Sequence, residues 1–530
     1  MNANITRRSL LNSAGALAVA PASRIPVPGD SRRPRLDTRP DSAYDLRVHA
    51  ALRQSHVVPS RHMPNGDEAL LSGRIASYTK ALPHAPNGEV SEDAFRAMLE
   101  ALSSGKPSDF ELIPLGYGRR LTNPQAAFAY ALEGGDSHRF GMPPAPSFSS
   151  EEAAWEMTEL YWQSLARDVP FADYAASPVI SEAANELGTT PAAVFRGETP
   201  GDLQGPYISQ FLLQPVPYLS GKLEQRYRTP RPGTSFMTSF DEWLRIQQGD
   251  APARAAQYLS ELRYLNCGRD LAEYVHYDVL YQPYLNAAMI LLNRGPESEG
   301  ADGSSVLHPA NPYRSSPTED GFVTFGAAHI ADWLGRVSTA ALKAAWCQKW
   351  LVHRRLRPEA FGGRVHLKLA GEESYPIPQD LLQSTALARS FMEHGSYLLP
   401  QAYPEGSPTH PSYPAGHATV AGACSVILKS FFDEDALLTN CVESTADGLA
   451  LQPCRAGFAP SIGAEVNKLA FNTSMGRDWA GIHYRSDARE GMRLGEEVAI
   501  SVLEDLADTF TEKFSGLSFT RLDGTRVKIK

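Results

Sequence analysis

The feature of this sequence that most constrains its fold is an apolar spacing typical of α-helices in five long segments. Apolar residues recur every three or four positions in residues 149–167, 271–292, 330–351, 418–432 and 489–510. Alternation of apolar and polar residues, which is typical of strands, is almost absent elsewhere. The exception is the C-terminus, where alternating residues flank Asp523-Gly524 and predict a small β-hairpin. We therefore expect an all-α protein with long loops and one C-terminal hairpin.

The charge and hydropathy of the chain argue against two classes of partner. Lys and Arg total 50 against 60 for Asp and Glu, which gives the 530-residue chain a formal net charge of −10. A chain this acidic has no overall attraction for nucleic acid, so any bound anion needs a local basic pocket. The longest nearly apolar stretch, residues 418–428, has eleven residues, whereas a membrane-spanning helix needs about 20. We expect no nucleic-acid partner and no membrane span.

The first 22 residues have the pattern of an export signal. Arg7-Arg8 precedes a short Ala-rich apolar run in residues 14–20, and Ala20 and Ala22 fit the −3 and −1 positions of a cleavage site. This pattern predicts twin-arginine export and a periplasmic or secreted protein. The alternative is a disordered basic terminus without a targeting role.

The five cysteines do not have the spacing of a zinc site. Cys347 and Cys424 lie in apolar helical patterns, which predicts buried thiols. Cys441 and Cys454 flank a polar, Gly-containing stretch that a disulfide could close. Free thiols at both positions are the alternative.

A first group of cations follows the helical pattern that runs into residues 349–359. Pro358 disfavours helical geometry at Arg357, so Lys349 and Arg357 lie near a helix end, two turns apart. Two long side chains can converge there. We interpret the residues between them, His353, Arg354 and Arg355, as a solvated basic face.

A second group lies where a Pro-rich loop runs directly into the apolar helix of residues 418–432. Gly416 and His417 fall in the first helical turn, where free N–H groups and the helix dipole favour an anion. His410 precedes them in the loop. One alternative is a capping loop with incidental histidines. A metal site formed by the two histidines is another, although no acidic residue lies near them in sequence.

A third group combines Arg477, His483 and Asp487. Gly481 allows the chain to change direction after Arg477. His483 and Asp487 are four residues apart, which would place them on one helical face. Asp487 could then accept the Nδ1 proton of His483 and leave Nε2 as a lone-pair donor. A lone pair of this kind could equally be a helix cap.

The three groups together describe a site for an oxyanion. Lys349, Arg357 and Arg477 can neutralise the oxygens of a tetrahedral or trigonal-bipyramidal anion. The helix N-terminus supplies backbone donors, and two histidines complete the set. The sequence has no phosphate-binding loop of the GxxxxGKS/T type, no HExxH, no strand-associated GxGxxG and no GxSxG nucleophile elbow.

This combination resembles the superfamily shared by vanadium-dependent haloperoxidases and type 2 phosphatidic-acid-phosphatase-like acid phosphatases. Seven residues separate Lys349 from Arg357. That spacing is similar to the algal bromoperoxidases and their bacterial relatives, whereas the phosphatases and the fungal chloroperoxidases usually have six. Segments similar to the same subgroup also occur at residues 121–125, 159–162, 165–168, 204–207, 268–270 and 467–469.

The resemblance implies a fold and a division of the chain. The fold would be helical bundles with two four-helix-bundle cores, and the protein a homo-oligomer. The expected regions are a signal peptide (1–22), an N-terminal linker and helical region (23–110), a helical scaffold (111–320), a vanadate-binding catalytic helical bundle (321–512) and the hairpin (513–530).

The resemblance also implies a role for each matching residue. His483 corresponds to the histidine bonded to vanadium, and Lys349, Arg357 and Arg477 to the cations that hold the equatorial oxygens. The Gly416 amide corresponds to a backbone donor.

Two histidines of the second group would act on the substrates. His417 corresponds to the acid–base histidine beside the apical oxygen. His410 corresponds to a second histidine that is typical of bromide-oxidising members.

The sequence departs from the family at Ala415, where a serine usually bonds a vanadate oxygen. The loss of one hydrogen bond to a charged group costs about 1.5–3 kcal/mol, so we expect the remaining cations to hold vanadate more weakly. The hydroxyl of Ser412 could replace it.

The implied activity is that of a haloperoxidase with one vanadate per subunit. Hydrogen peroxide would oxidise bromide or iodide to hypohalous acid, which halogenates small organic acceptors. Lys349 would polarise the bound oxygen, and His417 would move the proton. The alternative is an acid phosphatase in which His483 attacks phosphate and His417 protonates the leaving group. A protein that has lost activity through Ala415 is a third interpretation.

Overall fold

The structure of the chain, a computed structural model, describes residues 38–293 and 306–529. The predicted export signal therefore lies outside the described residues. The chain divides into two compact units, residues 1–51 and residues 52–530. Helix α2 (Arg39–His56) begins in the first unit, and all other described helices and strands belong to the second.

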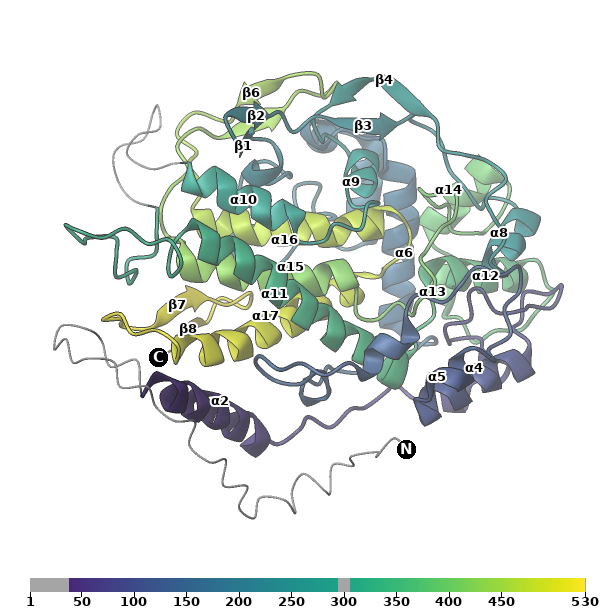
Figure 1. The fold of residues 1–530 in the computed structure, drawn as a ribbon. Helices are drawn as coiled ribbons and strands as arrows, with labels where there is room; N and C mark the ends of the chain where they lie inside the picture. The colour runs from purple at the N-terminus through teal and green to yellow at the C-terminus, as the bar shows by residue number, and fades with distance from the viewer. Residues whose placement is uncertain (1–37, 294–305, 530) are drawn as a thin grey trace, which may run out of the picture. The chain divides into compact units, whose positions relative to one another are not determined.

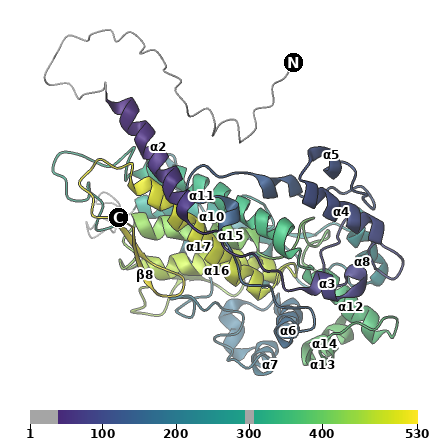
Figure 2. The same cartoon turned by 90° about the horizontal axis from the view of Figure 1, so that it is seen from below.

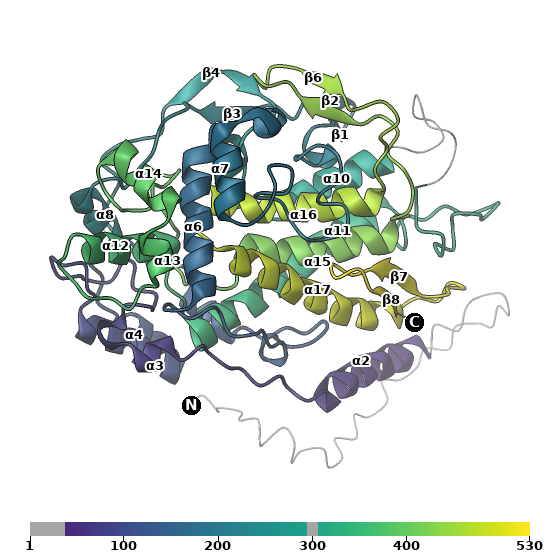
Figure 3. The ribbon, with the colours of Figure 1, turned by 180° about the vertical axis from the view of Figure 1, so that it is seen from behind.

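The core of the second unit is a bundle of four helices. They are α11 (Ala327–Cys347), α15 (Gly416–Phe431), α16 (Ile462–Trp479) and α17 (Arg485–Ala507). Helix α15 packs against the other three, and the four lie side by side in the front view and in the views from below and from behind (Figure 1, Figure 2, Figure 3). Every residue of α15 except His417 is buried, so this helix is the centre of the bundle.

Two glycines allow α15 and α17 to approach closely. A Cβ atom on Gly422 would lie 1.9 Å from the Met492 carbonyl oxygen, and one on Gly495 would lie 1.9 Å from that of Thr419. Neither position can carry a side chain unless the two helix backbones move apart. The helix that begins at Gly416 is thereby held against the helix that carries Asp487.

A second, smaller group of helices surrounds α6 (Glu151–Ala166), which runs crosswise to the bundle (Figure 1, Figure 3). Helices α7 (Pro178–Glu186), α13 (Gln379–Leu382) and α14 (Thr385–His394) pack against α6. Helix α9 (Gly268–Tyr274) packs on α16, and α10 (Gln282–Leu292) packs on α11 and α15. The predicted helical class is confirmed, with α6, α15 and α17 close to their expected positions.

The remaining helices are short and lie mostly in the N-terminal half. The α-helices are α3 (Asp67–Leu70), α4 (Glu92–Ser104), α5 (Pro107–Phe110), α8 (Phe240–Gln247) and α12 (Pro358–Leu369). Short 3₁₀ segments are η1 (Ser72–Arg74), η2 (Pro124–Phe128), η3 (Ser137–Arg139), η4 (Phe171–Ala176) and η5 (Gln210–Leu212), and η6 (Gln348–His353) is π-helical. In the described residues, no helix is both long enough and apolar enough to cross a membrane.

Four two-stranded antiparallel sheets complete the described fold, and only the last was predicted. They pair β1 (Val216–Tyr218) with β2 (Gly221–Leu223), β3 (Tyr227–Pro230) with β4 (Tyr258–Arg263), β5 (Val442–Ser444) with β6 (Leu451–Pro453), and β7 (Leu517–Thr520) with β8 (Arg526–Ile529). The first three were missed because strands of three to six residues are too short for a clear alternation. Cys441 and Cys454 form a disulfide beside β5 and β6, so of the two alternatives left open by the sequence the structure has the disulfide.

The prediction of one helix across residues 271–292 is wrong. Helix α9 ends at Tyr274 and α10 begins at Gln282, and residues 275–281 form a connection between them. Pro283 lies in the first turn of α10, where its missing N–H is tolerated, but it could not lie inside a continuous helix. The break places Val275 and Asp278 on a loop beside the N-terminus of α15.

The close approach at Gly422 can be tested by substitution. Gly422→Ala should lower the free energy of unfolding by about 1–3 kcal/mol, because the added methyl overlaps the Met492 carbonyl. Gly335→Ala in α11 is the matched control: its Cβ meets no atom within 4 Å, so it should stabilise the protein by about 0.5–1 kcal/mol. Urea unfolding followed by tryptophan fluorescence measures both. Equal midpoints for Gly422→Ala and the parent protein would contradict the packing described.

Candidate active site

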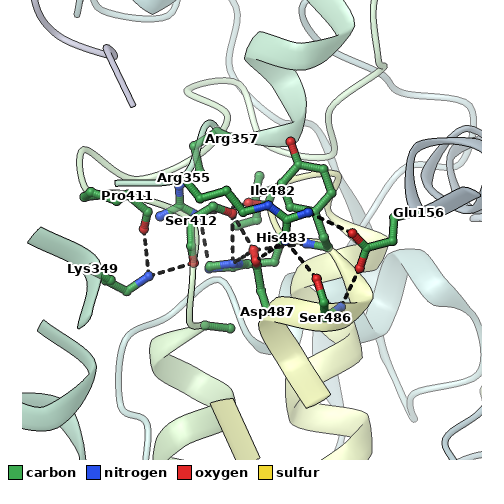
Figure 4. Close-up of polar contacts among 12 residues, drawn as sticks. Glu156, Lys349, Arg355, Arg357, Pro411, Ser412, Ile482, His483, Ser486 and Asp487 are labelled. Atoms are coloured by element: carbon green, nitrogen blue, oxygen red, sulfur yellow. Dashed lines mark hydrogen bonds and ion pairs between the residues drawn. The ribbon is translucent and has the colours of Figure 1, made fainter. Parts of the chain in front are cut away.

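Cations of the first sequence group clamp the loop of the second. Lys349, on the π-helical segment, donates from Nζ to the carbonyl oxygens of Pro411 at 2.7 Å and Ser412 at 2.9 Å (Figure 4). Arg357, the residue before α12, donates from Nε to the His410 carbonyl at 2.9 Å. Arg357 has extended geometry, as Pro358 predicts. The two cations therefore converge on residues 410–412, although they belong to different helical segments rather than to one helix end.

The third sequence group contacts these cations through His483. Its Nε2 atom lies 2.9 Å from Arg357 Nη1, and its Nδ1 atom lies 2.8 Å from Asp487 Oδ2. Because a guanidinium only donates hydrogen bonds, Nε2 is the acceptor and Nδ1 carries the proton. Burial, followed by the charge of Arg357, holds the pKa of His483 well below its usual range. His483 is thus a neutral imidazole whose lone pair faces a cation.

The contact between His483 and Asp487 is confirmed, but not on a helical face. His483 precedes α17, and Tyr484 is the residue that caps this helix. Asp487 accepts the backbone N–H of Tyr484 at 3.2 Å, so the aspartate also caps the helix. Gly481 has a φ of 84°, which provides the expected turn after Arg477. The two expected roles of Asp487, histidine partner and helix cap, occur together.

Arg355 was interpreted as part of a solvated basic face, and this is wrong. Its Nη1 atom donates to Asp487 Oδ1 at 2.7 Å and its Nη2 atom to Glu156 Oε2 at 2.8 Å (Figure 4). Its guanidinium lies 3.7 Å from the centre of the Tyr484 ring. His353 is also buried, and Arg354 pairs with Glu68 at 2.8 Å. The partners of Arg355 are 132 and 199 residues away in sequence, so no local pattern indicated them.

Arg477 and His417 meet at the backbone of Val275. Arg477 donates from Nη1 to the Val275 carbonyl at 2.7 Å, and His417 also forms a hydrogen bond with the Val275 backbone. The Nε atom of Arg477 and the Nε2 atom of His417 are buried without hydrogen-bond partners. Asp278 Oδ1 approaches His417 Nε2 at 3.8 Å. Neither Val275 nor Asp278 was predicted, because both lie on the break between α9 and α10.

The cations of the site have no carboxylate partners of their own. Among the described residues, no Asp or Glu forms an ion pair with Lys349, Arg357 or Arg477, and all three are at most 5% exposed. Burial and the charge of Arg357 hold the pKa of Lys349 well below its usual range, and burial lowers that of Arg357 to about 10. An oxyanion among them would relieve this repulsion and satisfy the free donors. The residues present therefore fit vanadate or phosphate.

His410 lies beside the cations rather than among multiple metal ligands. Arg357 Nη2 donates to its Nδ1 atom at 2.9 Å, and its ring centre is 4.9 Å from that of Trp346. In the described part of the chain, no group of three His, Cys, Asp or Glu side chains is placed to hold a metal ion. The arrangement favours an anion site with a single histidine ligand over a site built from His410 and His417.

The structure also bears on the replacement of the missing serine. Ala415 is buried, and its N–H donates to the Asp487 carbonyl at 2.9 Å. The hydroxyl of Ser412 donates to Asp487 Oδ2. Because that hydroxyl has one proton, Ser412 supports the aspartate and has none left for an anion. Gly416 begins α15 as expected.

Known proteins resemble the chain over nearly its whole length. A vanadium-dependent bromoperoxidase of Ascophyllum nodosum is 35% identical, over 93% of this chain and 92% of the relative. One of Corallina officinalis is 33% identical, over 95% of this chain and 100% of the relative. The homohexameric structure of the second vanadate-dependent bromoperoxidase (AnII) of Ascophyllum nodosum superposes with a TM-score of 0.86 at 27% identity, over 99% of this chain and 96% of the other.

A family model agrees with these relatives. The model of the VCPO second helical-bundle domain matches residues 379–512, a range that includes α15, α16 and α17 with His417, Arg477 and His483. The identity to the bromoperoxidases extends across both helical groups as well as the site. The chain therefore belongs to the family of vanadium-dependent haloperoxidases.

Proposed function

We propose that the protein oxidises bromide and iodide with hydrogen peroxide to hypohalous acid, using one vanadate per subunit. The observation that carries the proposal is the Nε2 lone pair of His483, which accepts a hydrogen bond from Arg357 Nη1 at 2.9 Å and lies within a group of buried cations. Curated relatives at 33–35% identity are bromoperoxidases. The overall reaction combines peroxide, halide and one proton to give hypohalous acid and water.

The chain's own residues would hold the vanadate. His483 Nε2 supplies the one protein ligand, and the proton on Nδ1 stays with Asp487, which keeps that lone pair available. Lys349, Arg357 and Arg477 supply positive charge to the oxygens, and the N-terminus of α15 at Gly416 supplies a backbone donor. Bound vanadate supplies a Lewis acid at which peroxide becomes reactive toward halide.

We assign the proton transfer to His417. Its Nε2 atom is buried, free of hydrogen bonds and directed by the contact of the ring with the Val275 backbone. Burial and the charge of Arg477 hold the pKa of His417 well below its usual range, so the ring is neutral and can accept a proton from peroxide. Lys349, fixed by two carbonyl oxygens, polarises the oxygen that the halide attacks.

We also propose a halide preference, a site of action and an assembly. His410, which corresponds to a histidine typical of bromide-oxidising members of the family, lies beside Arg357, and this supports oxidation of bromide and iodide over chloride. The Arg7-Arg8 pattern supports twin-arginine export to the periplasm or the medium. The homohexameric structure of AnII supports a homo-oligomer.

One assay tests the proposal against the phosphatase alternative. The apoprotein with orthovanadate, hydrogen peroxide and bromide should form hypobromous acid, and without vanadate it should hydrolyse no phosphomonoester. His483→Ala removes the single ligand, so it should give no bromide oxidation at any vanadate concentration. His394→Ala on α14, outside the site, is the matched control and should keep full activity. Phosphomonoester hydrolysis that depends on His483, without vanadate-dependent bromide oxidation, would overturn the proposal.

Arg355 should control vanadate affinity through Asp487. Besides Asp487 and Glu156, Arg355 Nη1 donates to the Ser486 hydroxyl at 2.8 Å. Arg355→Lys keeps the charge but cannot reach all three partners together, so the aspartate and His483 lose their fixed orientation. We expect the Kd for vanadate to rise about 10- to 100-fold. Arg354→Lys, at the neighbouring residue that pairs with Glu68, is the matched control and should leave the Kd unchanged. Equilibrium dialysis with elemental analysis measures vanadate directly, and equal Kd values for the two variants would refute the role of Arg355.

Ala415→Ser should restore the hydrogen bond that the family usually has. The Ser412 hydroxyl already donates to Asp487, so the new hydroxyl would supply a hydrogen-bond donor to vanadate that Ser412 does not. We expect the Kd for vanadate to fall about tenfold, from a gain of about 1.5 kcal/mol. The same dialysis measures it. If the two proteins bind vanadate equally, another donor already fills this place.

A further inference from the structure

A pocket of about 390 Å³ opens beside His417. Tyr227, Tyr274 and Tyr277 supply aromatic rings to its lining, together with Val275 and Val279. The rings of Tyr227 and Tyr274 are 5.0 Å apart and meet edge to face. A pocket of this size, mostly apolar with a few polar groups, is typical of a site for one small organic molecule.

The wall of the pocket is tied directly to the active site. It includes the connection of residues 275–281, whose first residue, Val275, bonds to both Arg477 and His417. From the same connection, Asp278 lies 3.8 Å from His417 Nε2. That nitrogen is buried, has no hydrogen-bond partner and belongs to a residue that lines the pocket. A molecule in the pocket would therefore lie beside the group that handles the proton of peroxide.

The rim of the pocket is held in place by a cation. Arg228 donates from Nη2 to the Tyr277 hydroxyl at 3.2 Å, and its guanidinium lies 3.7 Å from the centre of the Tyr258 ring. Tyr277 is 61% exposed, so an exposed ring is fixed by a hydrogen bond instead of by packing. Aromatic walls favour an aromatic guest, because rings pack edge to face or offset on one another.

We propose that this pocket binds a neutral, electron-rich aromatic acceptor of the phenol class and directs its halogenation. The inference rests on the proposed function, because the active site must supply the hypohalous acid. The carbon–bromine bond forms at a ring carbon as the oxygen–bromine bond of hypobromous acid breaks. The proton lost from that carbon joins the hydroxide to give water. Binding in the pocket fixes which ring carbon faces the active site, and that carbon is the one halogenated.

Two variants alter the pocket without replacing a contact of Lys349, Arg357 or Arg477. Tyr277→Ala removes a ring from the rim, and Val279→Trp, at a residue that is 51% exposed, fills the space. Tyr218→Ala is the matched control, because Tyr218 is 59% exposed and lies on β1 outside the pocket. All three positions are exposed enough for the variants to fold.

The first measurement needs no turnover. Saturation-transfer NMR with phenol as the probe should show binding to the full-length protein and to Tyr218→Ala. Binding should weaken about two- to tenfold in Tyr277→Ala, the range expected for one lost aromatic contact, and disappear in Val279→Trp. Equal phenol binding by all four proteins, or none by the parent, would overturn the proposal.

The second measurement separates this proposal from the proposed function. Triiodide formation from iodide and peroxide needs no organic acceptor, so it should be equal in all four vanadate-loaded proteins. With bromide and phenol, the parent should give an ortho-to-para ratio different from that of reagent hypobromous acid, and both pocket variants should shift toward the reagent ratio. Normal triiodide formation with the reagent ratio in every protein would overturn the pocket alone. Absence of triiodide from the parent would refute the proposed function, and the NMR result would still decide whether the pocket binds phenol.

Discussion

The candidate site depends on the hydrogen bonds that the carboxylate of Asp487 accepts. It accepts hydrogen bonds from His483 Nδ1, from Arg355, from the Ser412 hydroxyl and from the backbone of Tyr484. These donors come from three separate parts of the chain. One buried charge thereby fixes the tautomer of the histidine, joins the proline-rich loop to the bundle and caps α17.

Within the part of the chain that the structure describes, the other cations of the site have no carboxylate partner. Asp487 and Glu156 neutralise Arg355, whereas Lys349, Arg357 and Arg477 bond to carbonyl oxygens or to histidine nitrogens. Buried cations of this kind repel one another, and an oxyanion that enters removes that repulsion. The bundle supplies the rigidity that keeps them in place, because α15 and α17 contact each other through glycines with no room for adjustment. A rigid, positively charged cage around one neutral histidine suits a vanadate cofactor as well as it suits phosphate, and it is the similarity to bromoperoxidases along the whole chain that favours the peroxidase.

The sequence was sufficient for the parts of the site that depend on local order. Pro358 predicted the extended backbone at Arg357, the loop-to-helix junction predicted Gly416 in the first turn of α15, and the four-residue spacing predicted contact between His483 and Asp487. The contact between His483 and Asp487 does not arise on one helical face, as the spacing had suggested. It arises because Asp487 caps α17, just after His483. The all-α class was likewise predictable, because apolar spacing of 3.6 residues persists through α6, α15 and α17.

The sequence was insufficient wherever a role depends on a distant partner. Arg355 looked like a surface residue because Glu156 and Asp487 are far away in the chain. The connection of residues 275–281 keeps an apolar spacing, so its break from helix was hidden, and with it the positions of Val275 and Asp278 beside His417. The other three sheets were hidden for a related reason, because strands of three to six residues are too short for a clear period.

The most direct test of the account is the position of vanadium in crystals of the vanadate-loaded protein, located by anomalous scattering. The account predicts one vanadium per subunit, within bonding distance of His483 Nε2. It also predicts oxygens that contact Lys349, Arg357 and Arg477. A vanadium atom bonded to His410 or His417, or one outside the cations altogether, would contradict it.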